Sequence, residues 1–225
     1  MTGLFITLEG GEGSGKSTQA GLMKQWFVDL YPRREIIVTR EPGGTEPAEE
    51  IRNILVNGAA DKLAVQTEAL LMIAARTEHV LKVVKPGLMR DAIVICDRFS
   101  DSTLVYQGLA HGLDIDLLRS IHQFGFSDLR PDITFVLDLP PEQGLQRAEI
   151  RAKEQNNESR FEEKGLSFHK GVRDGFITLA KDEPSRFIIV DASGTVEQTD
   201  RLIKQHISKR LQRHHANDAQ EQDFL

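Results

Sequence analysis

Residues 10–17 read Gly-Gly-Glu-Gly-Ser-Gly-Lys-Ser and match the phosphate-binding pattern G-x-x-x-x-G-K-[ST] at every fixed position. The pattern follows the apolar run 4–8 and opens a helix-like stretch, 16–30. Glycines in such a turn let backbone N–H groups wrap around phosphate oxygens at a helix N-terminus. Lys16 would reach the β- and γ-phosphates, and Ser17 would give one oxygen ligand to Mg²⁺. A glycine-rich turn that binds nothing is the alternative; strand, motif and helix in register favour the phosphate site.

Charged residues also stand where two other apolar runs end. Arg40 follows the run 35–39, and Asp97 and Arg98 follow the run 92–96. Parallel strands end at one edge of their sheet, so we expect these residues near the phosphate loop. Asp97 would orient Mg²⁺, often through water, and the arginines could bind anionic oxygens. A helix cap at Asp97 and a surface ion pair at Arg40 are the alternatives; three charged positions around one phosphate loop favour a site.

A polar, charge-rich segment near 143–163, called the lid segment below, carries three more arginines. Arg147 and Arg151 lie one helical turn apart, and Arg160 follows a polar stretch. A lid that closes over a nucleotide excludes water and brings positive charge to the transferred phosphoryl group. We therefore expect a mobile lid with these arginines in catalytic roles; an ordinary solvated helix is the alternative.

Composition indicates a compact enzyme. The 225 residues suit one α/β domain, expected over 1–212, with a polar and frayed tail over 213–225. A net charge of −6 and a pI near 5.7 argue against nucleic acid as a partner. The single cysteine, Cys96, lies in an apolar run and is expected to be a buried core thiol. No leader or membrane-spanning segment is recognisable, so we expect a cytoplasmic protein without a membrane partner.

The elements that position these residues are short apolar runs alternating with longer helical stretches. Strands are expected at 5–8, 35–39, 92–96, 133–139 and 186–190. Helices are expected at 15–30, 47–57, 66–90 with a break at Pro86, 101–124, 141–154, 166–182 and 196–211. This pattern predicts a doubly wound α/β fold with a five-stranded parallel sheet, and ligands at the carboxyl ends of the strands.

Five segments, taken in order, resemble bacterial thymidylate kinases, which are P-loop nucleoside monophosphate kinases: 5–18, 39–45, 70–76, 97–108 and 130–140. A phosphate loop alone is shared with many unrelated NTPases, but the ordered set is specific. The resemblance implies Mg²⁺-dependent transfer of the γ-phosphoryl group of ATP to dTMP, giving dTDP and ADP. It also implies a homodimer.

The resemblance assigns roles by position. ATP would be held by Gly10, Gly11, Glu12, Gly13, Ser14, Gly15, Lys16, Ser17 and Thr18. The acceptor dTMP would be held by Arg40, Pro42, Met72, Arg76, Arg98, Ser102, Thr103, Tyr106 and Gln107. Arg98 would bind the dTMP phosphate and act in catalysis with Lys16, Glu12 and the lid arginines. Glu12 would approach the sugar and phosphate end of the acceptor. Arg76 and Thr103 would address the thymine edge, and Tyr106 would crowd the sugar where a ribose 2′-OH would lie.

Two positions depart from the family pattern. Many members place Phe where this chain has Met72, so a softer contact would replace stacking on the base. Ser159 stands where the lid usually has Asp before the arginine. The phosphate loop has no arginine, which fits the branch with arginines in the lid.

Rival classes are less well supported. The triplet 174–176 matches part of an adenylate kinase motif but lies after the lid segment, and no Asn-Lys pair exists to read guanine as in GTPases. An ATP-driven nucleic-acid machine would need a basic groove. A kinase for a different nucleoside monophosphate remains the open alternative. In either case we expect direct in-line transfer without a general base, because the acceptor is already a phosphate oxygen.

Overall fold

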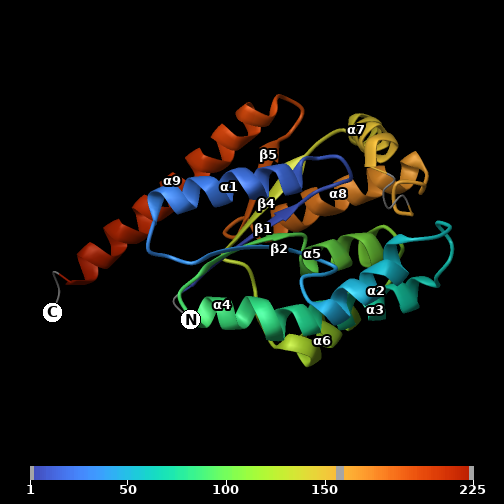
Figure 1. Cartoon of the computed structure of the whole chain (residues 1–225), viewed down its shortest axis with the longest axis horizontal. Coiled ribbons are helices and arrows are strands. Elements are labelled where there is room, and N and C mark those ends of the chain that lie inside the picture. The colour runs from blue at the N-terminus through green and yellow to red at the C-terminus, as the bar shows by residue number, and fades with distance from the viewer. Residues whose placement is uncertain (1–2, 156–159, 223–225) are drawn as a thin grey trace.

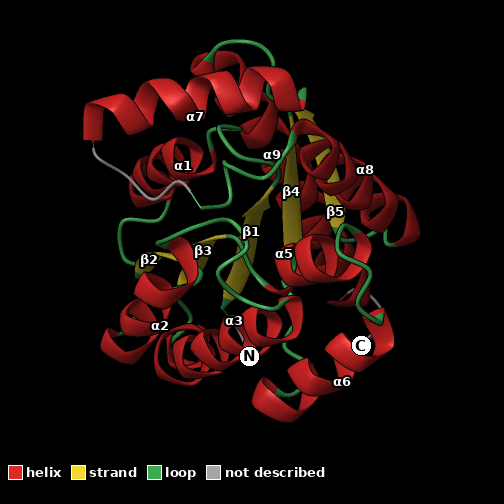
Figure 2. Ribbon diagram, turned by 90° about the vertical axis from the view of Figure 1, so that its right-hand side faces the viewer, coloured by secondary structure: helices red, strands yellow, loops and turns green. Residues whose placement is uncertain are grey.

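A computed structural model describes residues 3–155 and 160–222. Its centre is a five-stranded, all-parallel sheet with strand order β2-β3-β1-β4-β5. The strands are β1 (Leu4–Glu9), β2 (Ile36–Arg40), β3 (Ile93–Asp97), β4 (Ile133–Asp138) and β5 (Phe187–Asp191). Each lies within one residue of the predicted run. The runs are apolar on both sides because helices cover both faces of the sheet, and Figure 2 shows the strands enclosed between them.

The helices are α1 (Lys16–Leu30), α2 (Glu46–Val56), α3 (Val65–His79), α4 (Lys85–Met89), α5 (Ser100–Thr103), α6 (Ile115–Phe126), α7 (Pro141–Gln155), α8 (Leu166–Asp182) and α9 (Val196–Gln222). Helices α1 and α9 lie together on one face of the sheet (Figure 1). There Met23 and Phe27 of α1 pack with Ile6 of β1 and Ile203 of α9. Helices α3, α4 and α8 pack against the opposite face. The predicted doubly wound fold is confirmed.

The predicted helix 66–90 contains a π-helical turn, η1 (Val80–Val84). The sequence predicted a break at Pro86, but the interruption lies before this residue. Pro86 lies in the first turn of α4, where a missing N–H group is tolerated.

The predicted helix 101–124 is divided into α5, a π-helical turn η2 (Leu104–Leu109) and α6. Gly112 has φ +81°, and the Asp114 side chain caps α6 by accepting from two backbone N–H groups. These two residues end one helix and begin the next. Helix α9 also runs beyond residue 211, to Gln222.

None of the helices in the described part of the chain combines the length and the apolar character that a membrane span requires.

Candidate active site

The phosphate-binding pattern forms the turn between β1 and α1. Gly13 has φ +66°, and a Cβ atom there would lie 2.0 Å from the carbonyl oxygen of Gly144 at the start of α7. Gly10 has φ +133°, and its Cβ would lie 2.6 Å from the carbonyl oxygen of Leu137. Both positions therefore require glycine for conformation and for space. The loop is held against β4 and α7, which fixes its shape.

Lys16 begins α1, and its amino group lies inside the phosphate loop. Nζ donates to the carbonyl oxygens of Gly10 and Gly11, at 3.2 and 2.8 Å, and to Ser14 Oγ at 3.2 Å. Burial and then the nearby charge of Arg98 lower the pKa of Lys16 to about 8. The loop carbonyls thus hold the ammonium group where a bound phosphate would take their place as acceptor.

Ser17, in the first turn of α1, meets Asp97, the last residue of β3, beside the phosphate loop, as predicted. Ser17 Oγ donates to Asp97 Oδ2 at 2.5 Å. A hydroxyl and a carboxylate oxygen are hard ligands of the kind that Mg²⁺ prefers, so this pair fits the cation implied by the sequence.

Arg98 connects the phosphate loop to the rest of the cavity. Its Nη2 forms an ion pair with Glu12 Oε1 at 2.8 Å, and its Nη1 donates to the Gly10 carbonyl oxygen at 3.0 Å and to Ser102 Oγ at 3.2 Å. Tyr106 donates its hydroxyl to the same Glu12 oxygen at 2.9 Å, and its ring lies 5.0 Å from the guanidinium carbon. The backbone of Arg98 has φ +69°, in the left-handed region.

Glu12 is ionised in this arrangement. Burial alone would favour the neutral acid, but the charges of Arg98 and Lys16 and the hydroxyl of Tyr106 outweigh it and lower the pKa of Glu12 to about 2. The loop carboxylate therefore fixes the Arg98 guanidinium at the end of the phosphate loop.

Glu9, the last residue of β1, was not among the predicted site residues. Its carboxyl group accepts from the backbone N–H of Phe99 at 2.8 Å and from Ser102 Oγ at 2.6 Å. Burial and then the charge of Asp101 raise the pKa of Glu9 to about 8. A neutral acid thus supports the turn that carries Arg98. An acid at the end of an apolar strand was the only available sequence signal.

Arg76, from α3, is a buried residue in the wall of the main cavity, where it takes part in a network of hydrogen bonds. Nε pairs with Glu41 Oε2 at 2.5 Å, and Nη2 donates to the Phe99 carbonyl oxygen at 3.0 Å. Nη1 lies 2.9 Å from Thr103 Oγ1 and 3.0 Å from His122 Nε2. Arg76 and Thr103 are thus brought together, as predicted, but Glu41 and His122 were not predicted.

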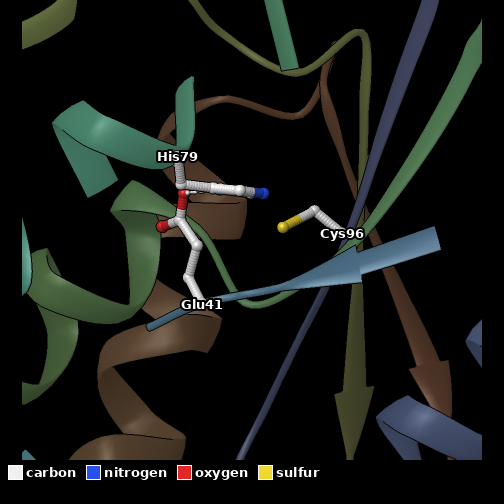
Figure 3. A group of neighbouring side chains, drawn as sticks. All are labelled: Glu41, His79 and Cys96. Carbon is white, nitrogen blue, oxygen red and sulfur yellow. Dashed lines mark hydrogen bonds and ion pairs between the residues drawn. The ribbon is translucent and has the colours of Figure 1, made fainter. Parts of the chain in front are cut away.

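Glu41 is supported in turn by His79, as Figure 3 shows beside Cys96. The ligand atoms of these three residues lie within 4.8 Å of one another. His79 Nδ1 is 2.8 Å from Glu41 Oε1, and its Nε2 is 2.7 Å from Thr39 Oγ1. Cys96 Sγ contacts a backbone carbonyl oxygen at 3.0 Å, and burial raises its pKa. Because these atoms already have partners, the cluster supports Arg76 and is not arranged as a metal centre. Cys96 is the buried thiol that was predicted.

Of the lid arginines, Arg147 and Arg160 have described side chains, and both form their hydrogen bonds away from the phosphate loop. Arg147 Nη1 donates to the carbonyl oxygen of Ala192, in the loop after β5, at 3.2 Å. Arg151 follows one turn later on α7, and its side chain and Ser159 lie outside the described residues.

Arg160 is 1% exposed and joins the lid segment to α2 and α3. Nη1 donates to the Leu55 carbonyl oxygen at 2.8 Å, and Nε donates to that of Ala59 at 3.2 Å. Nη2 pairs with Glu68 Oε2 at 2.6 Å, and Gln107 donates to the other oxygen of this carboxylate at 2.7 Å. Contact with a phosphate would require Arg160 to leave Glu68.

Arg40 forms the surface ion pair that was its alternative interpretation, with Nη2 3.1 Å from Glu49 Oε2 and both side chains exposed. Its neighbour Pro42 accepts from Arg52 Nη1 through its carbonyl oxygen at 2.8 Å. Both Arg40 and Pro42 nevertheless face the main cavity.

One cavity of about 610 Å³ gathers most of the predicted site residues, a volume suited to nucleotide-sized ligands. It is lined by Glu12, Gly13, Ser14, Gly15, Lys16, Ser17, Thr18, Arg40, Pro42, Met72, Arg76, Asp97, Arg98, Ser102, Thr103, Tyr106, Gln107 and Arg160. Gly10, Gly11 and Arg147 do not line it. Glu41, Arg52, Val56, Phe161 and Glu162 line it without having been predicted.

Comparisons with known proteins agree with this geometry. A family model described as thymidylate kinase matches residues 8–203. The thymidylate kinase of Caulobacter vibrioides is 44% identical over 209 residues, covering 93% of this chain and 98% of that protein. The thymidylate kinase of Geobacter sulfurreducens is 43% identical over 213 residues, covering 94% and 99%. A crystal structure of thymidylate kinase from Ehrlichia chaffeensis superposes with a TM-score of 0.73 at 34% identity, covering 94% of this chain and all of that chain. The chain belongs to the thymidylate kinase family.

Proposed function

We propose that this protein transfers the γ-phosphoryl group of ATP to dTMP, giving ADP and dTDP. The observation that carries the proposal is the position of Arg98. Its guanidinium is held between the phosphate loop, through Gly10, and a polar pocket that contains Arg76 and Thr103. A cation between a triphosphate site and a base-sized pocket is what binding of an acceptor phosphate requires.

The donor side is built from the loop and α1. Residues 10–18 would hold the phosphates of ATP, with Lys16 donating to the β- and γ-phosphate oxygens. Ser17 and Asp97 would hold Mg²⁺, which neutralises phosphate charge when it is bound.

The acceptor side is the polar pocket around Arg76. Arg98 would bind the dTMP phosphate, and Glu12 would hold Arg98 and approach the sugar. Arg76 and Thr103 would donate to the thymine edge. The remaining contacts with dTMP would come from Arg40, Pro42, Met72, Ser102, Tyr106 and Gln107.

Transfer would proceed in line and without a covalent intermediate. Positioning and charge neutralisation dominate such chemistry, so no side chain is needed as a general base. Arg147 and Arg151 would bring positive charge to the γ-phosphoryl group when the lid segment closes. Arg160 would contribute charge to the γ-phosphoryl group only after exchanging Glu68 for a phosphate. In its present position it forms part of the wall of the acceptor pocket.

The wider expectations are one kinase domain over 1–212, a cytoplasmic location and a homodimer. Helices α3 and α6 pack together and expose the large apolar side chains of Leu70, Leu117 and Phe124. These side chains support a helical dimer interface. Sedimentation that gives a monomer at micromolar concentrations contradicts the homodimer.

The test is a coupled ADP-release assay with ATP and Mg²⁺, offering dTMP, dUMP, dCMP, UMP, AMP and GMP in turn. We expect a strong preference for dTMP. Lys16→Ala should abolish turnover, whereas Lys24→Ala, an exposed lysine on the same helix, should not. Preference for another monophosphate overturns the acceptor assignment, and no turnover with any of them overturns the kinase assignment.

A further inference from the structure

His122 contacts Arg76 from a helix outside the main cavity. It lies on α6, is 6% exposed and does not line the cavity that holds the phosphate loop. Its Nε2 is 3.0 Å from Arg76 Nη1. His122 can therefore act on a bound nucleotide only through Arg76, which lines the cavity.

The hydrogen bonds of Arg76 leave little freedom to its guanidinium. An arginine has five N–H donors in a rigid plane. Four are directed to Glu41, Thr103, His122 and the Phe99 carbonyl oxygen. Within the described residues this leaves one N–H group for a ligand. Its direction is set by the four partners that fix the plane.

His122 can accept from Arg76 only as a neutral imidazole with its proton on Nδ1. Burial and then the charge of Arg76 lower the pKa of His122 to about 3, so the ring is neutral at physiological pH. Among the described residues, Arg76 is the hydrogen-bond partner of His122 Nε2. His122 thus offers Arg76 an uncharged acceptor, whereas Glu41 offers a charged one.

We propose that His122 is a positioning residue for the acceptor base, which it controls by fixing the plane of the Arg76 guanidinium. This inference rests on the proposed function, in which Arg76 donates to the thymine edge. Loss of the His122 acceptor would free one side of the guanidinium and leave a buried N–H group without a partner. Binding of dTMP would then weaken, while ATP binding and the transfer step would not.

The experiment compares His122→Gln with His122→Met in steady-state kinetics. Glutamine places an acceptor oxygen near the position of Nε2, whereas methionine has a similar length and no strong acceptor. We expect His122→Met to raise KM for dTMP roughly tenfold, the effect of one buried hydrogen bond. The kcat value and KM for ATP should stay within about twofold, and His122→Gln should restore most of the affinity for dTMP.

Base selectivity gives a second readout. A fixed N–H donor pairs with a carbonyl oxygen on thymine but not with the amino group of cytosine. The ratio of kcat/KM for dTMP to that for dCMP should therefore fall in His122→Met and not in His122→Gln. Gln123→Met, at an exposed position on the same helix, serves as the control and should change neither readout.

Two outcomes overturn the proposal. One is an unchanged KM for dTMP in a folded His122→Met protein. The other is an equal increase in KM for dTMP in His122→Met and His122→Gln, which would indicate a packing effect alone. Thermal unfolding of each variant identifies loss of fold, and dTMP titration by calorimetry then measures binding in any variant too slow for kinetics. A wild-type protein that does not use dTMP refutes the proposed function itself, and that result is distinct because it precedes every comparison of variants.

Discussion

Replacement of Glu12 by glutamine should lower stability in a pH-dependent manner. The pKa of Glu12 is about 2 in the folded protein against an ordinary 4.5, mainly because Arg98 and Lys16 outweigh the effect of burial. At 1.36 kcal/mol per pKa unit, this shift corresponds to about 3 kcal/mol of unfolding free energy at neutral pH. Glutamine keeps an oxygen acceptor for Arg98 and Tyr106, so we expect a loss of about 1–3 kcal/mol, or about 3–10 °C in Tm for a chain of this size.

The sign follows from the lowered pKa. Stabilisation by Glu12 is fully present above the unfolded-state pKa of 4.5 and is lost as the pH falls through 2. The difference between wild type and Glu12→Gln should therefore be constant from pH 7 to 5 and fall to about half near pH 3.3.

The assay is urea unfolding followed by circular dichroism at several pH values. Glu35→Gln, which removes one partner of the exposed ion pair with Arg90, is the matched control and should leave the free energy of unfolding nearly unchanged. A Glu12→Gln protein as stable as the wild type at pH 7, or a difference that grows as the pH falls, would refute the electrostatic reasoning.

Three further perturbations test other parts of the site. Burial and a neighbouring arginine lower the pKa of Lys16 to about 8, so kcat/KM for ATP should fall as the pH rises through about 8. The decline should be absent in Lys16→Arg, and an identical decline there would assign it to another group. Gly144→Ala places a Cβ atom 2.3 Å from a phosphate-loop carbonyl oxygen and should reduce kcat/KM for ATP at least tenfold, whereas Gly171→Ala, whose Cβ meets only an atom at 3.9 Å, should not. Arg160→Ala leaves Glu68 buried without its main cation and should lower unfolding free energy by about 3 kcal/mol; equal unfolding curves in urea would contradict this.

The sequence predicted the sheet well because each strand is marked locally. Runs such as that of β3 are apolar on both faces and end in charged residues. The phosphate loop is equally local, since its glycines and Lys16 are adjacent in the chain. The positions of Ser17, Asp97 and Arg98 followed once the strands were taken as parallel, because parallel strands bring their carboxyl ends to one edge.

Contacts between distant residues could not be read in the same way. Arg160 was expected among phosphates, yet it pairs with Glu68, which stands 92 positions earlier in the chain. His122 and Glu41 look like ordinary surface or turn residues until the fold places them beside Arg76. The π-helical turns likewise depend on packing between helices and leave no clear periodicity in the sequence.

The left-handed backbone of Arg98 makes the active site sensitive to partial loss of the fold. A non-glycine residue at φ +69° costs about 1 kcal/mol, which the surrounding structure must offset. Here the N–H of Arg98 donates to the Leu8 carbonyl oxygen at 2.9 Å, so the pairing of β1 with β3 holds the turn. The carboxyl ends of β1 and β3 thus hold the Arg98 guanidinium in its direction. Weakened pairing between these strands should release the turn first, and catalytic loss would then precede global unfolding.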